Sequence, residues 1–200
     1  MNTDRNVRGA LLEAGRREFL AKGYEKASLR SICSDAGVTT GALYFFFKNK
    51  EELFVSIVSR TAERLMELVR RQTLAELSGN GDKDTCQHEL NLYLCTNRDE
   101  VRILLHRADG TPFEGFRDDY AREIAKGFYA FYDRCGGTEE YRDIMKLVVY
   151  MRIQGYIRML DGDYDMDKMM KFSALMEVYG DSGFAGMMQQ FESIAKGSVD

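Results

Sequence analysis

The side chains best suited to chemistry in this chain gather between Ser28 and Lys50, where hydroxyls, cations and aromatic rings alternate with small residues. Hydroxyl, ammonium and guanidinium groups bind phosphate oxygens, and aromatic rings can pack on sugar edges and thymine methyl groups. The spacing predicts two short helices joined by a tight turn at Gly37. A helix of this kind can enter a DNA major groove, so we expect recognition rather than catalysis.

Histidine and cysteine give little support to a catalytic or metal site. Two histidines occur, and no nucleophile motif or phosphate-binding glycine loop surrounds them. The four cysteines lack the paired spacing of a zinc site, so we expect reduced core residues. We therefore expect no metal and no cofactor. A helical enzyme that uses His88 or His106 as a base stays a minor alternative.

Composition indicates the elements that must position these side chains. The chain has 200 residues, 44% of them hydrophobic, and a single proline. No segment shows the strict alternation of a strand, so the sequence predicts an all-α fold. The apolar runs are too short for a signal peptide or a membrane span, and a cytoplasmic protein is expected.

Charge is divided unevenly along the chain. Residues 1–50 hold nine Lys or Arg and five Asp or Glu, whereas residues 51–200 hold nineteen and twenty-seven. A basic head on an acidic body is typical of a protein that attracts phosphate at one end. The excess is modest and decides little by itself.

The elements of the basic head follow from helical periodicity and from helix caps. Apolar residues at helical spacing predict a first helix over about 4–21, ended by Gly23. Ser28 is placed to cap a second helix, and Thr39 to cap a third, because their hydroxyls can accept from free amide groups. On the third helix Leu43 is expected to face inward. This arrangement predicts a helix-turn-helix in residues 1–50.

The other face of the third helix is unusually aromatic. Tyr44, Phe45 and Phe46 cannot all point inward with Leu43 and Phe47. Contact with a DNA groove would account for them, and packing of Phe45 and Phe46 on neighbouring helices is the alternative.

The stretch GVTTGALYFFFKNKEELF, preceded by SLRSICSDA, resembles the DNA-binding head of the TetR/AcrR family of bacterial repressors. The resemblance covers about residues 5–58. It implies that a defined set of residues contacts DNA: Ser28, Arg30, Thr39, Thr40, Gly41, Tyr44, Phe45, Phe46, Lys48 and Lys50. Ala42, Phe45 and Phe46 depart from the hydrogen-bonding residues common in the family. Direct readout would then depend on Arg30, Thr40 and Tyr44.

Residues 51–200 are expected to form a ligand-binding and dimerisation domain, which brings the chain to about nine helices. Pro112 is expected at the start of a helix that reaches residue 135. The segment Gly-Asp-Ser-Gly at 180–183 is expected to interrupt the last helix. The resemblance implies a homodimer, in which helices over about 139–160 and 166–195 pair with those of a second copy. From the residues alone, packing within one chain stays equally open.

An aromatic stripe over 113–132 is expected to line an effector cavity between helices, with plain hydrophobic core as the alternative. The candidate pocket residues are Arg102, His106, Phe116, Tyr120, Phe128, Tyr150, Met151 and Gln154. The resulting hypothesis is a repressor that a small, largely apolar effector releases from a near-palindromic double-stranded DNA operator. A DNA-binding protein that responds to no ligand is the main alternative.

Overall fold

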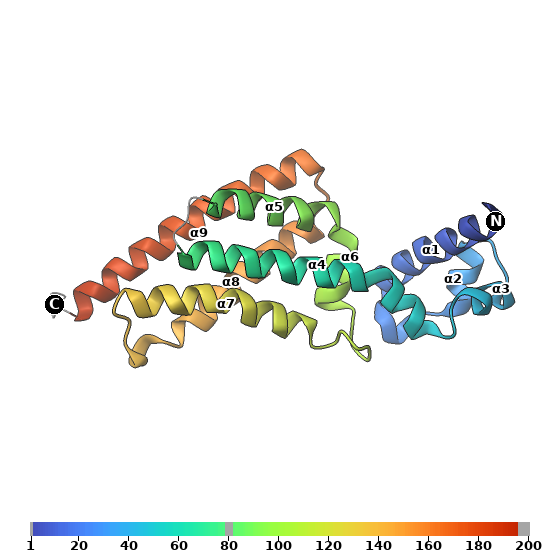
Figure 1. Cartoon of the computed structure of the whole chain (residues 1–200), viewed down its shortest axis with the longest axis horizontal. Coiled ribbons are helices and arrows are strands. Elements are labelled where there is room, and N and C mark those ends of the chain that lie inside the picture. Colours follow the sequence, from blue (N-terminus) through green and yellow to red (C-terminus); the bar gives the residue numbers. More distant parts are fainter. Residues whose placement is uncertain (1, 79–81, 196–200) are drawn as a thin grey trace. The chain divides into compact units, whose positions relative to one another are not determined.

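The computed structural model describes residues 2–78 and 82–195, and over these ranges the chain is built from helices without strands (Figure 1). Nine α-helices and one short 3-10 helix occur among the described residues, which confirms the all-α prediction and the expected number. Residues 1, 79–81 and 196–200 of the two expected domains lie outside these ranges. Over the described part of the chain, no helix is long and apolar enough to cross a membrane.

The described residues form two compact units. The head unit comprises 2–65 and 97–117, and the body unit comprises 66–78, 82–96 and 118–195. Helix α4 (Lys50–Ser78) contributes its first part to the head unit and its remainder to the body unit. The expected domain boundary at residue 50 stays a prediction.

The head unit contains α1 (Asn2–Lys26), α2 (Leu29–Asp35), α3 (Thr40–Phe46) and α6 (Arg98–His106). Its core consists of apolar side chains that are at most 1% exposed: Leu11, Phe19, Ile32, Leu43, Phe47, Leu53 and Phe54. The backbone of Gly23 is non-helical, so the regular part of α1 ends there as predicted. Gly37 has a φ of 67°, a left-handed value that glycine adopts without strain, in the turn between α2 and α3.

Helix α6 packs on α1 within the head unit, although the 71 residues 27–97 separate the two elements in the sequence. Arg16 lies 3.4 Å from a carboxylate oxygen of Asp99 and 3.6 Å from one of Glu100. The amide of Tyr24 donates to the carbonyl of Arg107 at 3.0 Å. This pairing cannot be predicted from local sequence patterns, because ordinary surface charges and backbone groups make it.

Pro112 does not begin a helix, so that prediction was wrong. The Thr111 hydroxyl donates to the carbonyl of Ala108 at 2.6 Å and accepts from the amide of Phe113 at 3.0 Å. These bonds hold residues 111–115 in turns, and α7 (Phe116–Arg134) begins only after them. A threonine side chain that bonds nearby backbone groups competes with helix formation.

The body unit contains α5 (Lys83–Thr96), α7, a 3-10 helix (Glu139–Tyr141), α8 (Ile144–Asp161) and α9 (Met166–Ala195). The long helix α9 runs beside both α5 and α8 (Figure 1). Tyr132, Met145 and Met188 form a buried cluster, and side chains from α7, α8 and α9 pack around it.

Helix α9 continues through 180–183, so the expected interruption was wrong. A glycine in a helix costs only about 1 kcal/mol relative to alanine. Side chains beyond the glycines are anchored, because Met188 is 3% exposed and Phe184 packs on the buried cluster. Packing of the side chains that follow the segment therefore outweighs its weak helix propensity.

Candidate nucleic-acid interface and cavities of the body unit

The two short helices of the head unit begin at side-chain caps, as predicted. The Ser28 hydroxyl accepts from the amide of Ser31 at 3.4 Å, and the Thr39 hydroxyl accepts from the amide of Ala42 at 3.2 Å. Both capping residues have extended backbones. These bonds satisfy amide groups that the first turn of a helix leaves free.

Glu18 on α1 ties α2 to the rest of the head unit. Its carboxylate accepts from the amide of Ser28 at 3.1 Å and from the hydroxyl of Ser31 at 3.2 Å, and it pairs with Lys22 at 2.9 Å. Burial acts to raise the pKa of Glu18, but these hydrogen bonds outweigh it and leave the pKa below its ordinary value. The helix that precedes the turn is thus fixed by a charged group.

Helix α3 has one buried and one exposed face. Leu43 is fully buried and Phe47, just after the helix, is 1% exposed. Tyr44 is 56% exposed and Phe45 is 78% exposed, while Phe46 is half-buried with its ring 5.0 Å from that of Phe45. Phe45 therefore does not pack into the core of this unit. Thr40 and Gly41 lie exposed at the N-terminal end of the helix.

The three basic residues assigned to DNA differ in their surroundings. Arg30 and Lys48 are exposed, and their side chains form no ion pair or hydrogen bond with the described residues. The Lys50 ammonium donates to three backbone carbonyls, those of Tyr24 at 2.7 Å and of Glu25 and Ala27 at 3.2 Å each. It also lies 4.4 Å from the centre of the Tyr24 ring. Lys50 thus holds the turn that precedes α2, and its contact with phosphate stays a prediction.

Comparison with known proteins agrees with this geometry. Residues 11–57 match the family model of the bacterial regulatory proteins of the tetR family. These residues of the head are therefore similar to the DNA-binding head of that family. The match covers α2, the turn and α3 completely and reaches into α4, so it spans the surface described above.

Two curated relatives extend the likeness. The chain is 36% identical over 72 residues to the HTH-type transcriptional repressor AcnR of Corynebacterium glutamicum, which is 36% of this chain and 38% of the relative. It is 35% identical over 105 residues to AcnR of Corynebacterium diphtheriae, which is 52% of this chain and 53% of the relative. The chain therefore spans only about a third to a half of the length of these relatives.

A solved structure extends the likeness to the fold of the whole chain. The structure of a transcriptional regulator from Aquifex aeolicus VF5 covers 86% of this chain and 99% of its own, with a TM-score of 0.52 and 19% identity. At this identity the comparison shows the all-helical fold, and it gives no information on ligands of the body unit.

The predicted pocket residues are divided between the two units. Arg102, His106 and Phe116 belong to the segment of the head unit at 97–117. The others belong to the body unit: Tyr120, Phe128, Tyr150, Met151 and Gln154. Tyr150 is 59% exposed and lines none of the three cavities described next, and neither does the half-buried Gln154.

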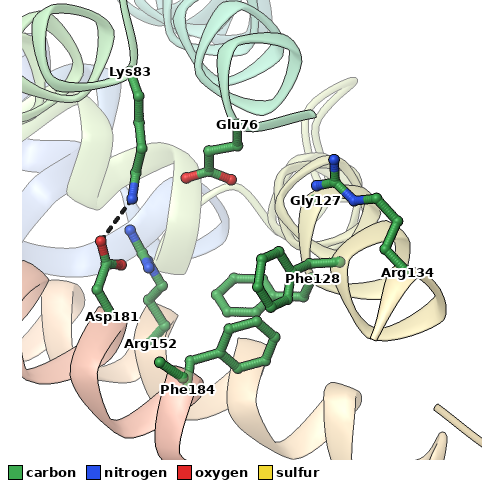
Figure 2. A pocket seen from close by; sticks show the side chains of 10 residues that line it. Glu76, Lys83, Gly127, Phe128, Arg134, Arg152, Asp181 and Phe184 are labelled. Atoms are coloured by element: carbon green, nitrogen blue, oxygen red, sulfur yellow. Dashed lines mark hydrogen bonds and ion pairs between the residues drawn. The ribbon is translucent and has the colours of Figure 1, made fainter. Parts of the chain in front are cut away.

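Three cavities lie within the body unit. The first, of about 350 Å³, is bounded by α4, α5, α7, α8 and α9, and Figure 2 shows charged and aromatic side chains converging on it. The second is a chamber of about 40 Å³ that includes Tyr120, and the third is a groove of about 440 Å³ between α8 and α9 that includes Met151. Phe128 and Arg152 line all three.

Several residues of the small chamber escaped the sequence analysis. Gln87 and Asn91 on α5 are 3% and 4% exposed and bond to each other at 3.0 Å. Arg152 on α8 donates to Gln87 at 3.4 Å. The sequence does contain a signal for them. The amides at 87 and 91 lie one helical turn apart beside the apolar Leu90 and Leu94, and polar groups on an apolar helix face need partners, which predicts a buried polar site.

Proposed function

We propose that this chain is a DNA-binding transcriptional regulator that acts as a repressor. The observation that carries the proposal is the outer face of α3. In a TetR-type helix-turn-helix, Tyr44 and Phe45 stand exposed on a helix whose opposite face is buried. Adjacent exposed rings of this kind mark a surface that a partner covers, and a DNA groove offers thymine methyls and sugar edges to them.

The proposed contacts follow from the position of each side chain. Thr40 and Gly41, at the exposed start of α3, would face base edges, where glycine allows close approach. Arg30 and Lys48 are exposed cations without partners in the described chain, and they would bind phosphates. Tyr44 would reach the groove wall with its hydroxyl.

A homodimer is the proposed active form. Helices α8 and α9 carry large apolar side chains that are 58–76% exposed, at the spacing of one helical face: Leu147, Tyr150, Met151, Leu175, Val178 and Tyr179. Covering both stripes with those of a second copy would make a four-helix bundle. A dimer matches a near-palindromic operator with half-sites about 34–36 Å apart.

The body unit is the proposed sensor. A small molecule that binds one arrangement of the dimer better than another lowers DNA affinity by that difference. The cavities of about 350 and 440 Å³ support this part of the proposal, because small-molecule sites commonly have volumes of roughly 300–1,000 Å³.

Selection from a random pool of double-stranded DNA, with the purified full chain, tests DNA recognition. We expect enrichment of a sequence with two inverted half-sites, and a dissociation constant for that duplex that rises steeply with salt. Tyr44→Ala should weaken binding. A pool without enriched sequences, or equal affinity for the selected and a scrambled duplex, contradicts the proposal.

Molar mass measured by light scattering tests the dimer. Val178→Asp places a charge on the exposed α9 stripe and should convert the dimer into monomers. Leu74→Asp is the matched control, because Leu74 is equally exposed, at 64%, but lies on α4 outside the stripes. If both variants keep the mass of the unmodified chain, the interface has been misplaced.

A further inference from the structure

We propose that the body unit binds an organic anion, whose carboxylate pairs with Arg152 and whose aromatic or other apolar part packs on Phe128, Phe131 and Phe184. The inference rests on the proposed function where it names this ligand as the effector. It replaces the largely apolar effector expected from the sequence with an amphipathic, negatively charged one.

Arg152 is a cation whose hydrogen-bonding capacity is largely unused. Its side chain is half-buried, lies over the Phe128 ring with Cζ 5.5 Å from the ring centre, and lines all three cavities. A guanidinium has five N–H donors, yet the only hydrogen bond of this side chain to the described residues is the 3.4 Å contact with Gln87. Its side chain forms no ion pair with the described residues. Glu177 on α9 does interact with it electrostatically, because burial raises the pKa of Glu177 and the charge of Arg152 acts to lower it. Removing a cation from water without a partner is unfavourable, and a bound anion would reverse that.

The other cations of the main cavity already have partners. Lys83 pairs with Asp181 at 2.6 Å, which the dashed line in Figure 2 marks. Arg134 donates to the carbonyl of Leu77 at 3.1 Å. Arg134 has unused donors as well, but among these cations it is Arg152 that also lines the small chamber, so Arg152 is the one placed to pair with a carboxylate there.

Two further polar groups of the small chamber lack partners. The Tyr156 hydroxyl and the Oε1 atom of Gln72 are buried without a hydrogen bond of normal geometry to the described residues, although Asn91 interacts with the hydroxyl, and Gln72 is only 5% exposed. Both residues line the chamber together with Arg152. Buried polar atoms are normally paired. A carboxylate accepts hydrogen bonds only, so it would accept from the Tyr156 hydroxyl and from Arg152, while the Gln72 oxygen would need a donor such as a bound water.

The two cavities differ in size, and each suits a different part of such a ligand. The chamber, at about 40 Å³, has room for a group the size of a carboxylate, since water occupies about 30 Å³ in the liquid. The adjoining cavity of about 350 Å³ shares Glu76, Phe128 and Arg152 with it. There the ring of Phe184 lies 5.0 Å from that of Phe128 and 5.4 Å from that of Phe131. These rings offer an apolar surface to the remainder of the ligand.

An organic cation is the competing ligand class, because Glu76 lines the same cavity. Its Oε1 atom already accepts from Gln72 at 2.9 Å. Its Oε2 atom lies against α7 at Gly127, where an added Cβ would approach it to 2.9 Å. Arg152 covers the Phe128 ring, so a bound cation would meet a like charge there. The contacts thus favour the anion.

Three probes of one shape separate the classes: 2-naphthoate, the neutral 2-naphthamide and 2-naphthylmethylammonium. Calorimetric titration of the full chain should show the tightest binding for naphthoate. Arg152→Gln should weaken naphthoate by about tenfold or more, since hydrogen bonds to charged groups are the strong ones, and change naphthamide by less than about twofold. Glu76→Gln is the matched control and should leave naphthoate affinity equal or higher.

Two further measurements show whether a loss of binding comes from misfolding: the unfolding temperature of each variant, and the naphthoate affinity of Arg152→Lys. Because Arg152 has no ion pair to lose, Arg152→Gln should unfold at the same temperature or higher, and Arg152→Lys should retain part of the naphthoate affinity. Undetectable naphthoate binding, or equal affinity for naphthoate and naphthamide, overturns the inference. Tightest binding of the ammonium probe, lost in Glu76→Gln, overturns it in favour of a cation.

The same variants separate this inference from the proposed function. The affinity for the selected duplex is measured with and without saturating naphthoate. If the chain binds the selected duplex but no naphthoate, the proposed DNA-binding function is retained and the anion site is rejected. Binding of naphthoate that depends on Arg152 but leaves DNA affinity unchanged supports the site and removes its role as effector.

Discussion

In the head unit, the charged groups beside the turn between α1 and α2 have hydrogen-bond partners, whereas the cations Arg30 and Lys48 and two aromatic rings of α3 are exposed. Lys50 donates to three carbonyls and Glu18 is held by Lys22, Ser28 and Ser31, while two aromatic rings of α3 stand in water. The body unit shows the reverse around its cavities. Its phenylalanine rings pack on one another, while Arg152 makes a single long hydrogen bond and some buried polar atoms have none of normal geometry.

The groups that lack partners differ between the two units, and they indicate different ligands. An exposed apolar surface between flanking cations fits a groove with methyl groups and a phosphate wall. Polar groups without full hydrogen bonding, beside a cavity lined by aromatic rings, fit a small molecule with one charged end. The contrast shows that the ligand class of a unit is best inferred from the side chains that its own fold leaves exposed or without hydrogen-bond partners.

The largest expected effect concerns the buried face of α3. Leu43→Ala removes a fully buried side chain from a small core and should cost about 2–5 kcal/mol of stability. Hydrogen exchange should then lose protection across α2 and α3 and keep it in α8, and DNA binding should fail. Thr40→Ala, an exposed change on the same helix, should preserve protection. Equal loss of protection in both units would mean that they do not unfold separately.

Lys50→Met tests whether this lysine serves the fold or the DNA. The change keeps the apolar stem and removes three hydrogen bonds from a charged donor, so we expect a loss of about 1–3 kcal/mol in the free energy of unfolding. The salt dependence of DNA binding should change little. Lys48→Met should do the opposite, with unchanged stability and a salt slope smaller by about 1. If Lys50→Met is as stable as the unmodified chain and the salt dependence of its DNA binding is reduced, Lys50 binds phosphate instead.

Alanine substitutions on the exposed surface should rank the DNA contacts. Arg30→Ala and Tyr44→Ala should each reduce affinity for the selected duplex by about 1–3 kcal/mol, and more than Phe46→Ala does. Phe46 is half-buried against Phe45, so its loss should appear partly as lower stability. Anisotropy titrations at one fixed salt concentration provide the comparison. Similar losses for all three would show that the exposed face of α3 has been misassigned.

The smallest expected effect is a pH dependence at Glu18. Its pKa is lowered in the folded state, so it contributes stability above its ordinary value of 4.5, and this contribution is lost as the pH falls through the folded pKa. Glu18→Gln should therefore flatten the decline of unfolding free energy in acid, measured by urea titration. Glu25→Gln, an exposed control, should leave that decline unchanged.

Local features of the head could be predicted because their causes lie within a few residues. A hydroxyl caps an amide three positions later, as at Ser28 and Thr39, and Gly23 ends a helix through its own backbone. Local rules failed where distant packing intervened. The glycines at 180–183 lie within one continuous helix because side chains beyond them are anchored, and Thr111 holds Pro112 in a turn.

The cavity could be predicted only in part. Tyr120 and Phe128 do line the chamber, and Arg152 was passed over although it lies between two residues that were named, Met151 and Gln154. One turn of α8 presents side chains in every direction. Which of them points toward α5 and α7 depends on how the helices pack, and periodicity within α8 does not contain that information.

The sequence by itself determined the helical class, the caps, the turn and the TetR-type character of the head, because these depend on residues close together in the chain. Only the tertiary structure decided that Lys50 holds a turn, that Phe45 stays in water and that Arg152 lies unpaired in a cavity. The physical reason is that a side chain's partners come from other helices, and a charge has a defined role only once those partners are in place.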